Sequence, residues 1–215
     1  MIRRLAIVVL AVTAVTALSQ AVFADPITFK LLSNQSRATF RTDAPLETIV
    51  GTTAGPAVTG SLSVDPSKPA GGQGSIKVDL TTLNSGVAAR DADMQKPQYL
   101  DTASEANKFA VFEIKGIEVE GPMEAGKEVM AKVEGILTIK QKPVELVADA
   151  RVTYVTLTSE QVEAQKRFGF SADNLKVRAK FGTTFTNHNM TVPQMLFFKL
   201  SNAIELETDL TFARQ

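Results

Sequence analysis

Apolar and polar residues alternate most clearly between residues 128 and 154. Successive side chains of a strand point to opposite faces, so a period of two predicts a half-buried strand. Before Lys140 the apolar or small positions are Val129, Ala131, Val133, Gly135, Leu137 and Ile139. After residues 140–143 they are Val144, Leu146, Ala148, Ala150, Val152 and Tyr154. We predict two antiparallel strands joined by a short turn, and we place Pro143 in the turn because proline cannot donate a ladder hydrogen bond.

Shorter alternating segments on either side predict the rest of a sheet. They cover residues 27–32, 37–41, 60–65, 75–83, 109–120, 176–185, 195–200 and 203–212. Within residues 109–120 the apolar parity changes at Gly116, because Phe112 and Ile114 share one parity and Ile117 and Val119 share the other. A change of parity at a glycine predicts a β-bulge.

Two segments break the strand period. Residues 84–108 predict short helical turns that form a cap over one end of the sheet. Residues 158–167 predict a polar surface helix, since Thr158 with Gln161 fits a capping box and Gly169 fits a stop.

Helices do not alternate with strands along the chain, so the sheet is expected to be antiparallel. The prediction is an all-β fold, a single antiparallel barrel or sandwich, and a barrel of about eight strands either fills with side chains or holds one small ligand. Several inward positions are small, which either leaves space or is complemented by a neighbouring phenylalanine, and the pattern alone favours a filled core. These positions are Ala131, Gly135, Ala148, Ala150 and Ala179.

The N-terminal residues predict export. Arg3 and Arg4 precede a mostly apolar segment at residues 5–18, and Val22-Phe23-Ala24 puts small residues at the two positions that signal peptidase reads. We expect a cleaved signal peptide at residues 1–24 and a domain at residues 25–215 that does not span a membrane.

Composition excludes several classes of function. The chain has no cysteine, which excludes disulfides, thiolate metal sites and cysteine nucleophiles. Its 23 basic residues balance 23 acidic ones, so no electrostatic footprint for nucleic acid is expected.

Residues capable of catalysis are few. His188 is the single histidine and lies in an Asn-His-Asn sequence typical of a turn. Asp91 and Asp93 could pair for acid–base work or cation binding, although solvated loop acids are the simpler interpretation. We expect neither an enzyme nor a metal site.

At several motifs the sequence resembles the YceI-like family of exported polyisoprenoid-binding proteins. Residues 133–140 followed by Lys142-Pro143-Val144 resemble its central hairpin, and residues 99–102 leading to residues 110–113 resemble its passage from cap to strand. Residues 36–40 and 60–65 fit its opening strands. The chain departs from the family pattern at Gln141, where glycine is usual, and at Lys108, where proline is common, and the cap segment lacks the histidine often found there.

The resemblance implies a lipocalin-like barrel with an apolar tunnel, a periplasmic location, no cofactor and no reaction. The implied ligand is an isoprenoid quinone, a polyprenyl chain or a fatty-acid-like lipid. The candidate tunnel residues are Phe112, Ile114, Val133, Leu137, Leu146, Phe181 and Phe185 on strands, with Met94, Tyr99 and Leu100 from the cap.

The alternative is a protein-interaction module with a fully packed barrel. Its outer face would then recognise another envelope protein through exposed apolar residues. Candidates for that face are Ile136, Val147, Leu196 and Phe198. The sequence leaves open whether the chain forms a homodimer.

Overall fold

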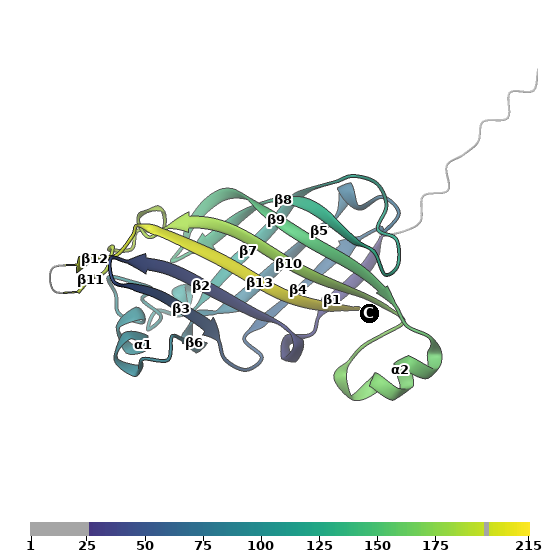
Figure 1. Ribbon diagram of the computed structural model, residues 1–215, viewed down its shortest axis with the longest axis horizontal. Helices are drawn as coiled ribbons and strands as arrows, with labels where there is room; N and C mark the ends of the chain where they lie inside the picture. The colour runs from purple at the N-terminus through teal and green to yellow at the C-terminus, as the bar shows by residue number, and fades with distance from the viewer. Residues whose placement is uncertain (1–25, 196–197) are drawn as a thin grey trace, which may run out of the picture.

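The computed structural model of the chain describes residues 26–195 and 198–215, and the signal peptide predicted at residues 1–24 lies outside them. Eight antiparallel strands form a closed barrel (Figure 1), which confirms the predicted fold class. Strand β1 closes the ring by pairing with both β4 and β13. In barrel order the strands are β1 (Ile27–Leu31), β4 (Val58–Val64), β5 (Gln73–Asp79), β7 (Phe109–Val119), β8 (Glu128–Ile139), β9 (Lys142–Thr156), β10 (Asp173–Thr184) and β13 (Ala203–Arg214).

Three further strands extend the wall at one end. Strand β13 pairs with β1 near its C-terminus and with β2 (Arg37–Ala44) through residues 205–209. Strand β2 pairs with β3 (Glu47–Thr53), which pairs with the short β6 (Leu83–Asn84). Strand β13 extends beyond the end of β1, and β2 pairs with the part of β13 that β1 does not reach.

The central hairpin forms as predicted, except for its proline. Strands β8 and β9 pair from Ile139 opposite Lys142 outward, and Lys140 and Gln141 form the turn with φ angles of 49° and 59°. The prediction that Pro143 lies in the turn is wrong, since Pro143 lies in β9 opposite Thr138. Strand β10 pairs with β9 only at residues 149–156, so no strand on that side requires an amide hydrogen from Pro143.

Other local predictions are confirmed. The register between β7 and β8 shifts between Ile114 and Gly116, which is the predicted bulge. Helix α2 (Ser159–Gln165) begins with a capping box formed by Thr158 and Gln161. Helix α1 (Ala88–Met94) and α2 lie at opposite ends of the barrel (Figure 1).

Residues 195–200 do not form the single strand that was predicted. Strands β11 (Gln194–Met195) and β12 (Phe198–Lys199) pair with each other as a separate two-stranded sheet. Figure 1 shows them beyond the α1 end of the barrel. No helix in residues 26–195 and 198–215 is long and apolar enough to cross a membrane.

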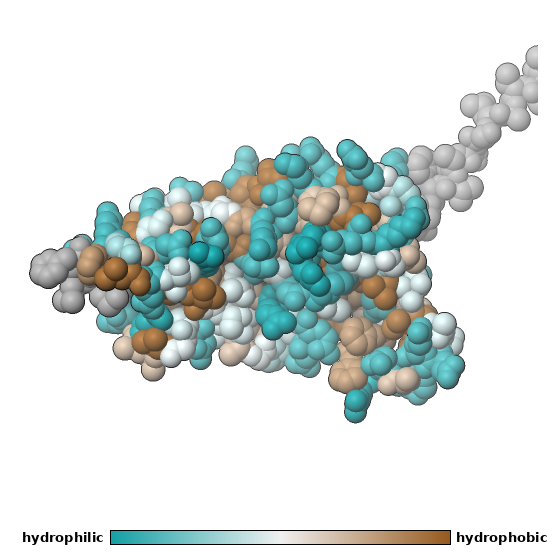
Figure 2. Space-filling view, viewed as in Figure 1, coloured by the Kyte–Doolittle hydropathy of each residue, from teal (hydrophilic) through white to brown (hydrophobic). Residues whose placement is uncertain are grey.

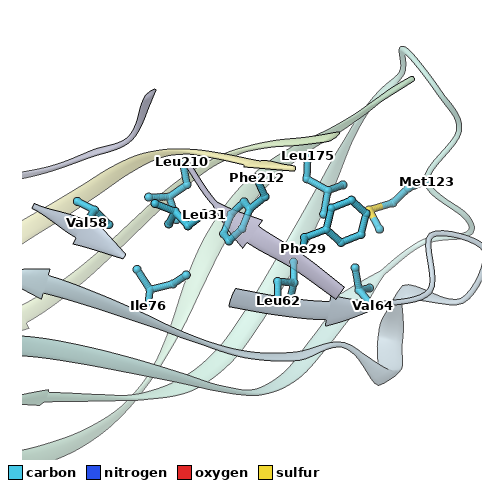
Figure 3. Packing of buried hydrophobic residues seen from close by; sticks show 10 residues of the cluster. All are labelled: Phe29, Leu31, Val58, Leu62, Val64, Ile76, Met123, Leu175, Leu210 and Phe212. Atoms are coloured by element: carbon cyan, nitrogen blue, oxygen red, sulfur yellow. The ribbon is translucent and has the colours of Figure 1, made fainter. Parts of the chain in front are cut away.

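Packing closes the end of the barrel that carries α2. Phe29, Leu175 and Phe212 are almost completely buried there, together with Met123 from the loop after β7. Figure 3 shows these side chains pointing toward one another from different strands, with Leu62 and Val64 beneath them. A dense apolar core therefore fills the barrel at the end that carries α2.

Candidate functional site

The barrel encloses an apolar cavity of about 600 Å³. Its wall comes from the inward side chains of the barrel strands, with β2 and β3 completing one side. Many inward side chains, including Ile114, Val133 and Val177, are only half-buried although they face the barrel axis. A barrel filled by its own side chains would bury them fully, so the filled core favoured by the pattern alone is wrong.

The cavity opens at the α1 end. Most exposed side chains on its wall belong to that end, and Glu207 on β13 is the exception. The others are Glu47, Val87, Ala89, Asp93 and Gln194. Figure 2 shows hydrophobic side chains on the surface at this same end, near β11 and β12. The opposite end is closed by the core of Figure 3, so the cavity is a tunnel with one open end.

All but one of the sequence-predicted tunnel residues lie on the cavity wall. Leu146 is the exception, because it packs in the cluster that contains Phe112 and Phe181 without reaching the cavity surface. The rings of Phe112 and Phe181 stack 5.7 Å apart, although β8 and β9 separate their strands. The nine residues on the wall are Met94, Tyr99, Leu100, Phe112, Ile114, Val133, Leu137, Phe181 and Phe185. Contact of these residues with a ligand stays a prediction.

Sequence reasoning did not select several wall residues. Phe40 and Ile49 reach the cavity from β2 and β3. The alternation around Phe40 was visible, but the chain gives no sign that β2 pairs with the distant β13. Thr208 on β13 also faces the cavity, and its polar side chain interrupts an otherwise apolar parity.

Ion pairs and hydrogen bonds hold α1 over the opening. Arg90 Nη1 lies 2.8 Å from Glu47 Oε1 on β3, and Arg90 Nε donates to Ser85 Oγ at 2.9 Å. Asp91 Oδ1 accepts from the backbone N–H and the hydroxyl of Ser85. Asp93 instead forms an ion pair with Lys96 at 2.5 Å. The two carboxylates thus have separate structural partners, which gives no support to the acid–base pair considered from the sequence.

His188 is completely buried and connects β9 and β10 through hydrogen bonds of its two ring nitrogens. Its Nδ1–H donates to the carbonyl oxygen of Lys142 at 3.2 Å, because a carbonyl can only accept. Nε2 then accepts from the Thr183 hydroxyl at 2.8 Å. Burial lowers the pKa of His188 from its usual 6.5, and the hydrogen bond to Lys142 opposes this. The neutral histidine therefore has a structural role that accounts for both ring nitrogens.

A second group with a shifted pKa lies at the closed end. The hydroxyl of Tyr154 donates to Asp173 Oδ1 at 2.6 Å, and Arg214 Nη1 lies 2.9 Å from Asp173 Oδ2. Burial and the Asp173 hydrogen bond raise the pKa of Tyr154 to about 12. The contacts join β9, β10 and β13. The described residues contain no cluster of histidine and acidic side chains that could hold a metal ion.

The surface residues of the interaction alternative do not form one patch. Ile136 and Val147 lie on the outer face of β8 and β9, where Val147 is 51% exposed. Phe198 lies on β12, outside the barrel, and Leu196 lies outside the described residues. The enclosed cavity also contradicts the fully packed barrel that this alternative requires.

Comparison with known families gives the decisive match. The model of the YceI-like domain matches residues 29–212, which includes all eight barrel strands apart from the outermost residues of β1 and β13. The chain belongs to the YceI-like family. The YceI-like domain thus accounts for the barrel and for the segment that carries α1.

Solved structures with low sequence identity share this fold. A polyisoprenoid binding domain from Saccharophagus degradans, described as implicated in plant cell wall breakdown, is 12% identical with a TM-score of 0.61, covering 88% of this chain and 99% of that one. Burkholderia cenocepacia BcnA is 14% identical with a TM-score of 0.59, covering 83% and 97%. A YceI protein of Campylobacter jejuni is 15% identical with a TM-score of 0.58, covering 77% and 84%. Curated protein sequences contain no match to the chain.

Proposed function

We propose that this protein binds the tail of an isoprenoid-type or other long-chain amphiphilic lipid in its cavity and carries it without catalysing a reaction. The observation that carries the proposal is the apolar tunnel with one open end. The fold shared with the Saccharophagus degradans polyisoprenoid binding domain supports the same class of ligand.

The size of the cavity suits such a tail. Burying a methylene group gains about 0.8 kcal/mol, and association together with tail ordering takes back several kcal/mol. Micromolar affinity requires a net gain of about 8 kcal/mol, so a tail needs on the order of twenty buried carbons. At about 25–30 Å³ for each carbon at interior packing density, a cavity of about 600 Å³ holds close to that number.

Delivery to the periplasm is part of the proposal. Its support is the basic start at Arg3 and Arg4, the apolar segment at residues 5–18 and the small residues at Val22 and Ala24, the two positions that signal peptidase reads. A lipid with a long apolar tail is nearly insoluble in water, and a closed barrel would shield the tail between membranes.

Replacement of Leu137 by lysine tests the proposal. Leu137 is 4% exposed and lies on the cavity wall, so a lysine there places a charge in the tunnel. We expect Leu137→Lys to remove lipid retention, measured by solvent extraction of the purified protein and quantification of lipid per chain. The matched control is Ile136→Lys, since the neighbouring Ile136 has the opposite parity and faces outward. It should retain lipid.

An uncharged variant separates blocked binding from misfolding. Val133 is half-buried and faces the cavity, so Val133→Trp fills lumen space without adding a charge. Circular dichroism checks that each variant keeps its sheet content. If folded Leu137→Lys and Val133→Trp both retain as much lipid as the wild type, the cavity is not the lipid site.

A further inference from the structure

Three separate segments place exposed apolar side chains at the open end of the tunnel. Leu46 lies in the two-residue turn between β2 and β3, and its 83% exposure is the largest among the large hydrophobic residues described. Val87 directly precedes α1 and Phe198 lies on β12, and they are 47% and 42% exposed. We call these three residues the mouth rim. Figure 1 shows the three segments at the same end of the barrel, and Figure 2 shows hydrophobic side chains on the surface there.

The segments of the mouth rim are bonded to one another. The amide of Ser201, just after β12, donates to the carbonyl oxygen of Asp43, just before the turn that carries Leu46, at 2.7 Å. The ion pair between α1 and the start of β3 joins the same turn to the segment of Val87. In the part of the chain that the structure describes, the hydrophobic clusters of the barrel contain none of the three rim residues. The rim is therefore one connected surface whose apolar side chains do not stabilise the core.

The other exposed large hydrophobic residues of the described chain are in different surroundings. Val50, Met130 and Val147 lie on the outer face of strands, and each has a charged residue directly opposite on the neighbouring strand. Phe168 lies at the closed end, where the guanidinium carbon of Arg167 is 4.6 Å from the centre of its ring. The mouth rim is thus distinct in joining exposed apolar side chains of several elements.

The tunnel indicates what covers the mouth rim. A lipid that enters the tunnel leaves a bilayer, and its apolar tail meets water during that step unless the opening lies against the bilayer. The cavity opens among the rim segments, and Val87 belongs both to the rim and to the cavity wall. Apolar surface is therefore continuous from the rim into the tunnel.

The charges beside the rim suit phospholipid headgroups. Lys199 is exposed next to Phe198 and has no ion-pair partner within residues 26–195 and 198–215. A lysine beside an inserted apolar side chain can extend its ammonium group to the lipid phosphates. The carboxylates near Leu46 are those of Asp43 and Glu47, and each lies within 3.6 Å of an arginine nitrogen. Their negative charge is compensated, so it opposes the approach of an anionic bilayer only weakly.

We propose that the mouth rim docks on the surface of a phospholipid bilayer, with Leu46 and Phe198 inserted at the headgroup boundary and Lys199 beside lipid phosphates. Insertion of this kind needs no matching partner surface, because each apolar side chain leaves water independently of the others. The inference rests on the proposed lipid-binding function and adds the surface through which the protein takes up or releases its lipid.

Tryptophan substitutions report docking at single positions, because the chain contains no tryptophan. Leu46→Trp and Phe198→Trp place one reporter each on the rim, and Val147→Trp places a control on the outer face of β9, where Val147 is 51% exposed. The vesicles contain phosphatidylcholine and, as one lipid in five, phosphatidylglycerol. A second set carries bromine on the acyl chains, which quenches any tryptophan that reaches them. Both rim reporters should shift to shorter emission wavelength and be quenched, and Val147→Trp should do neither.

The protein for these measurements lacks residues 1–24, since the apolar segment predicted to be a signal peptide would itself bind vesicles. Every helix and strand of the structure lies in the remaining residues. Circular dichroism checks that each variant keeps its sheet content.

Polar variants test whether docking serves lipid transfer. Leu46 and Phe198 lie off the cavity wall, so the double variant Leu46→Asp/Phe198→Asp should hold as much lipid per chain as the wild type. It should move a fluorescent lipid between vesicles about tenfold more slowly, because two apolar side chains no longer insert. Val147→Asp is the matched control and should transfer at the wild-type rate. Lys199→Gln should weaken binding to the anionic vesicles about fivefold, as expected for one basic residue at such a surface.

The outcomes separate the docking surface from the proposed function. If the rim reporters respond to vesicles no more than Val147→Trp does, the docking inference is wrong, and lipid retained by the same protein would leave the proposed function standing. Rim reporters that shift with protein concentration in the absence of vesicles would assign the rim to contact with a second copy of the chain and would also overturn the inference. A protein that docks but takes up no lipid would refute the proposed function alone.

Discussion

His188 is a buried titratable side chain whose two ring nitrogens are bonded to Lys142 and Thr183. Because its pKa in the folded protein is lowered from 6.5, the unfolded chain takes up a proton first as the pH falls. Its contribution to stability is therefore complete above about pH 6.5 and is lost progressively below that pH, by up to about 1.4 kcal/mol for each pH unit, until the folded histidine is protonated as well.

The prediction is a steeper pH dependence in the wild type than in His188→Gln. Urea unfolding at pH 7.5 and at pH 5 measures the free energy of unfolding of both proteins. Glutamine lowers stability at both pH values, but the wild type should lose more between them because only it contains the buried histidine. Asp173 and Asp209, whose pKa values are lowered by their hydrogen-bond and ion-pair partners, are common to both proteins. Equal losses in the two proteins would contradict this assignment.

The sequence predicted which side chains point into the barrel better than it predicted which distant residues they contact. The parity of Val133, Leu137 and Phe181 was correct, because a period of two is a local property of the chain. The contact of His188 with Lys142 joins residues 46 positions apart, and no local pattern encodes it. Leu146 has the right parity but packs among other side chains instead of lining the cavity.

At the scale of elements, one close contact fixes how β7 lies on β8. Gly135 on β8 has no side chain. The Phe112 ring from β7 occupies the space that a side chain at position 135 would fill. A Cβ at Gly135 would lie 2.3 Å from Phe112 Cζ and 2.6 Å from the backbone oxygen of Glu113. The backbone oxygen cannot move away without breaking the ladder between the two strands.

Gly135→Ala should therefore destabilise the protein by about 1–3 kcal/mol, as measured by urea unfolding. Gly182→Ala on β10 is the control, because the nearest atom to its added Cβ is the Ile204 oxygen at 3.8 Å. That variant should be neutral or more stable by up to about 1 kcal/mol, since alanine reduces the entropy of the unfolded chain. A Gly135→Ala protein as stable as Gly182→Ala would show that Phe112 does not occupy that space.

Elements encoded by neighbouring residues were predictable, and those that depend on distant pairing were not. The β8–β9 hairpin, the bulge at Gly116 and the capping box at Thr158 depend on residues close in the chain. The position of Pro143 depends on where β10 stops pairing with β9, which the sequence near Pro143 does not contain. The pairing of β2 with β13 joins opposite ends of the chain in the same way.

At the scale of the whole molecule, the cavity depends on which small inward residues are covered. The spaces beside Gly135 and Gly51 are filled by Phe112 and Phe40, whereas Ala131 and Ala179 remain on the cavity wall. A covered position and an uncovered one look alike in the sequence, since each carries a small residue of inward parity. Three-dimensional packing decides between them, and for this reason the pattern alone favoured a filled core.

Native mass spectrometry of the protein purified without detergent, followed by solvent extraction, tests the central claim most directly. The account predicts one additional mass per chain that disappears on extraction and is recovered as an amphiphile with a long apolar tail. If the protein emerges empty, the measurement is repeated after addition of prenyl lipids and fatty acids, and the same one-to-one complex should appear. A mass that stays that of the bare chain with every lipid would contradict the account.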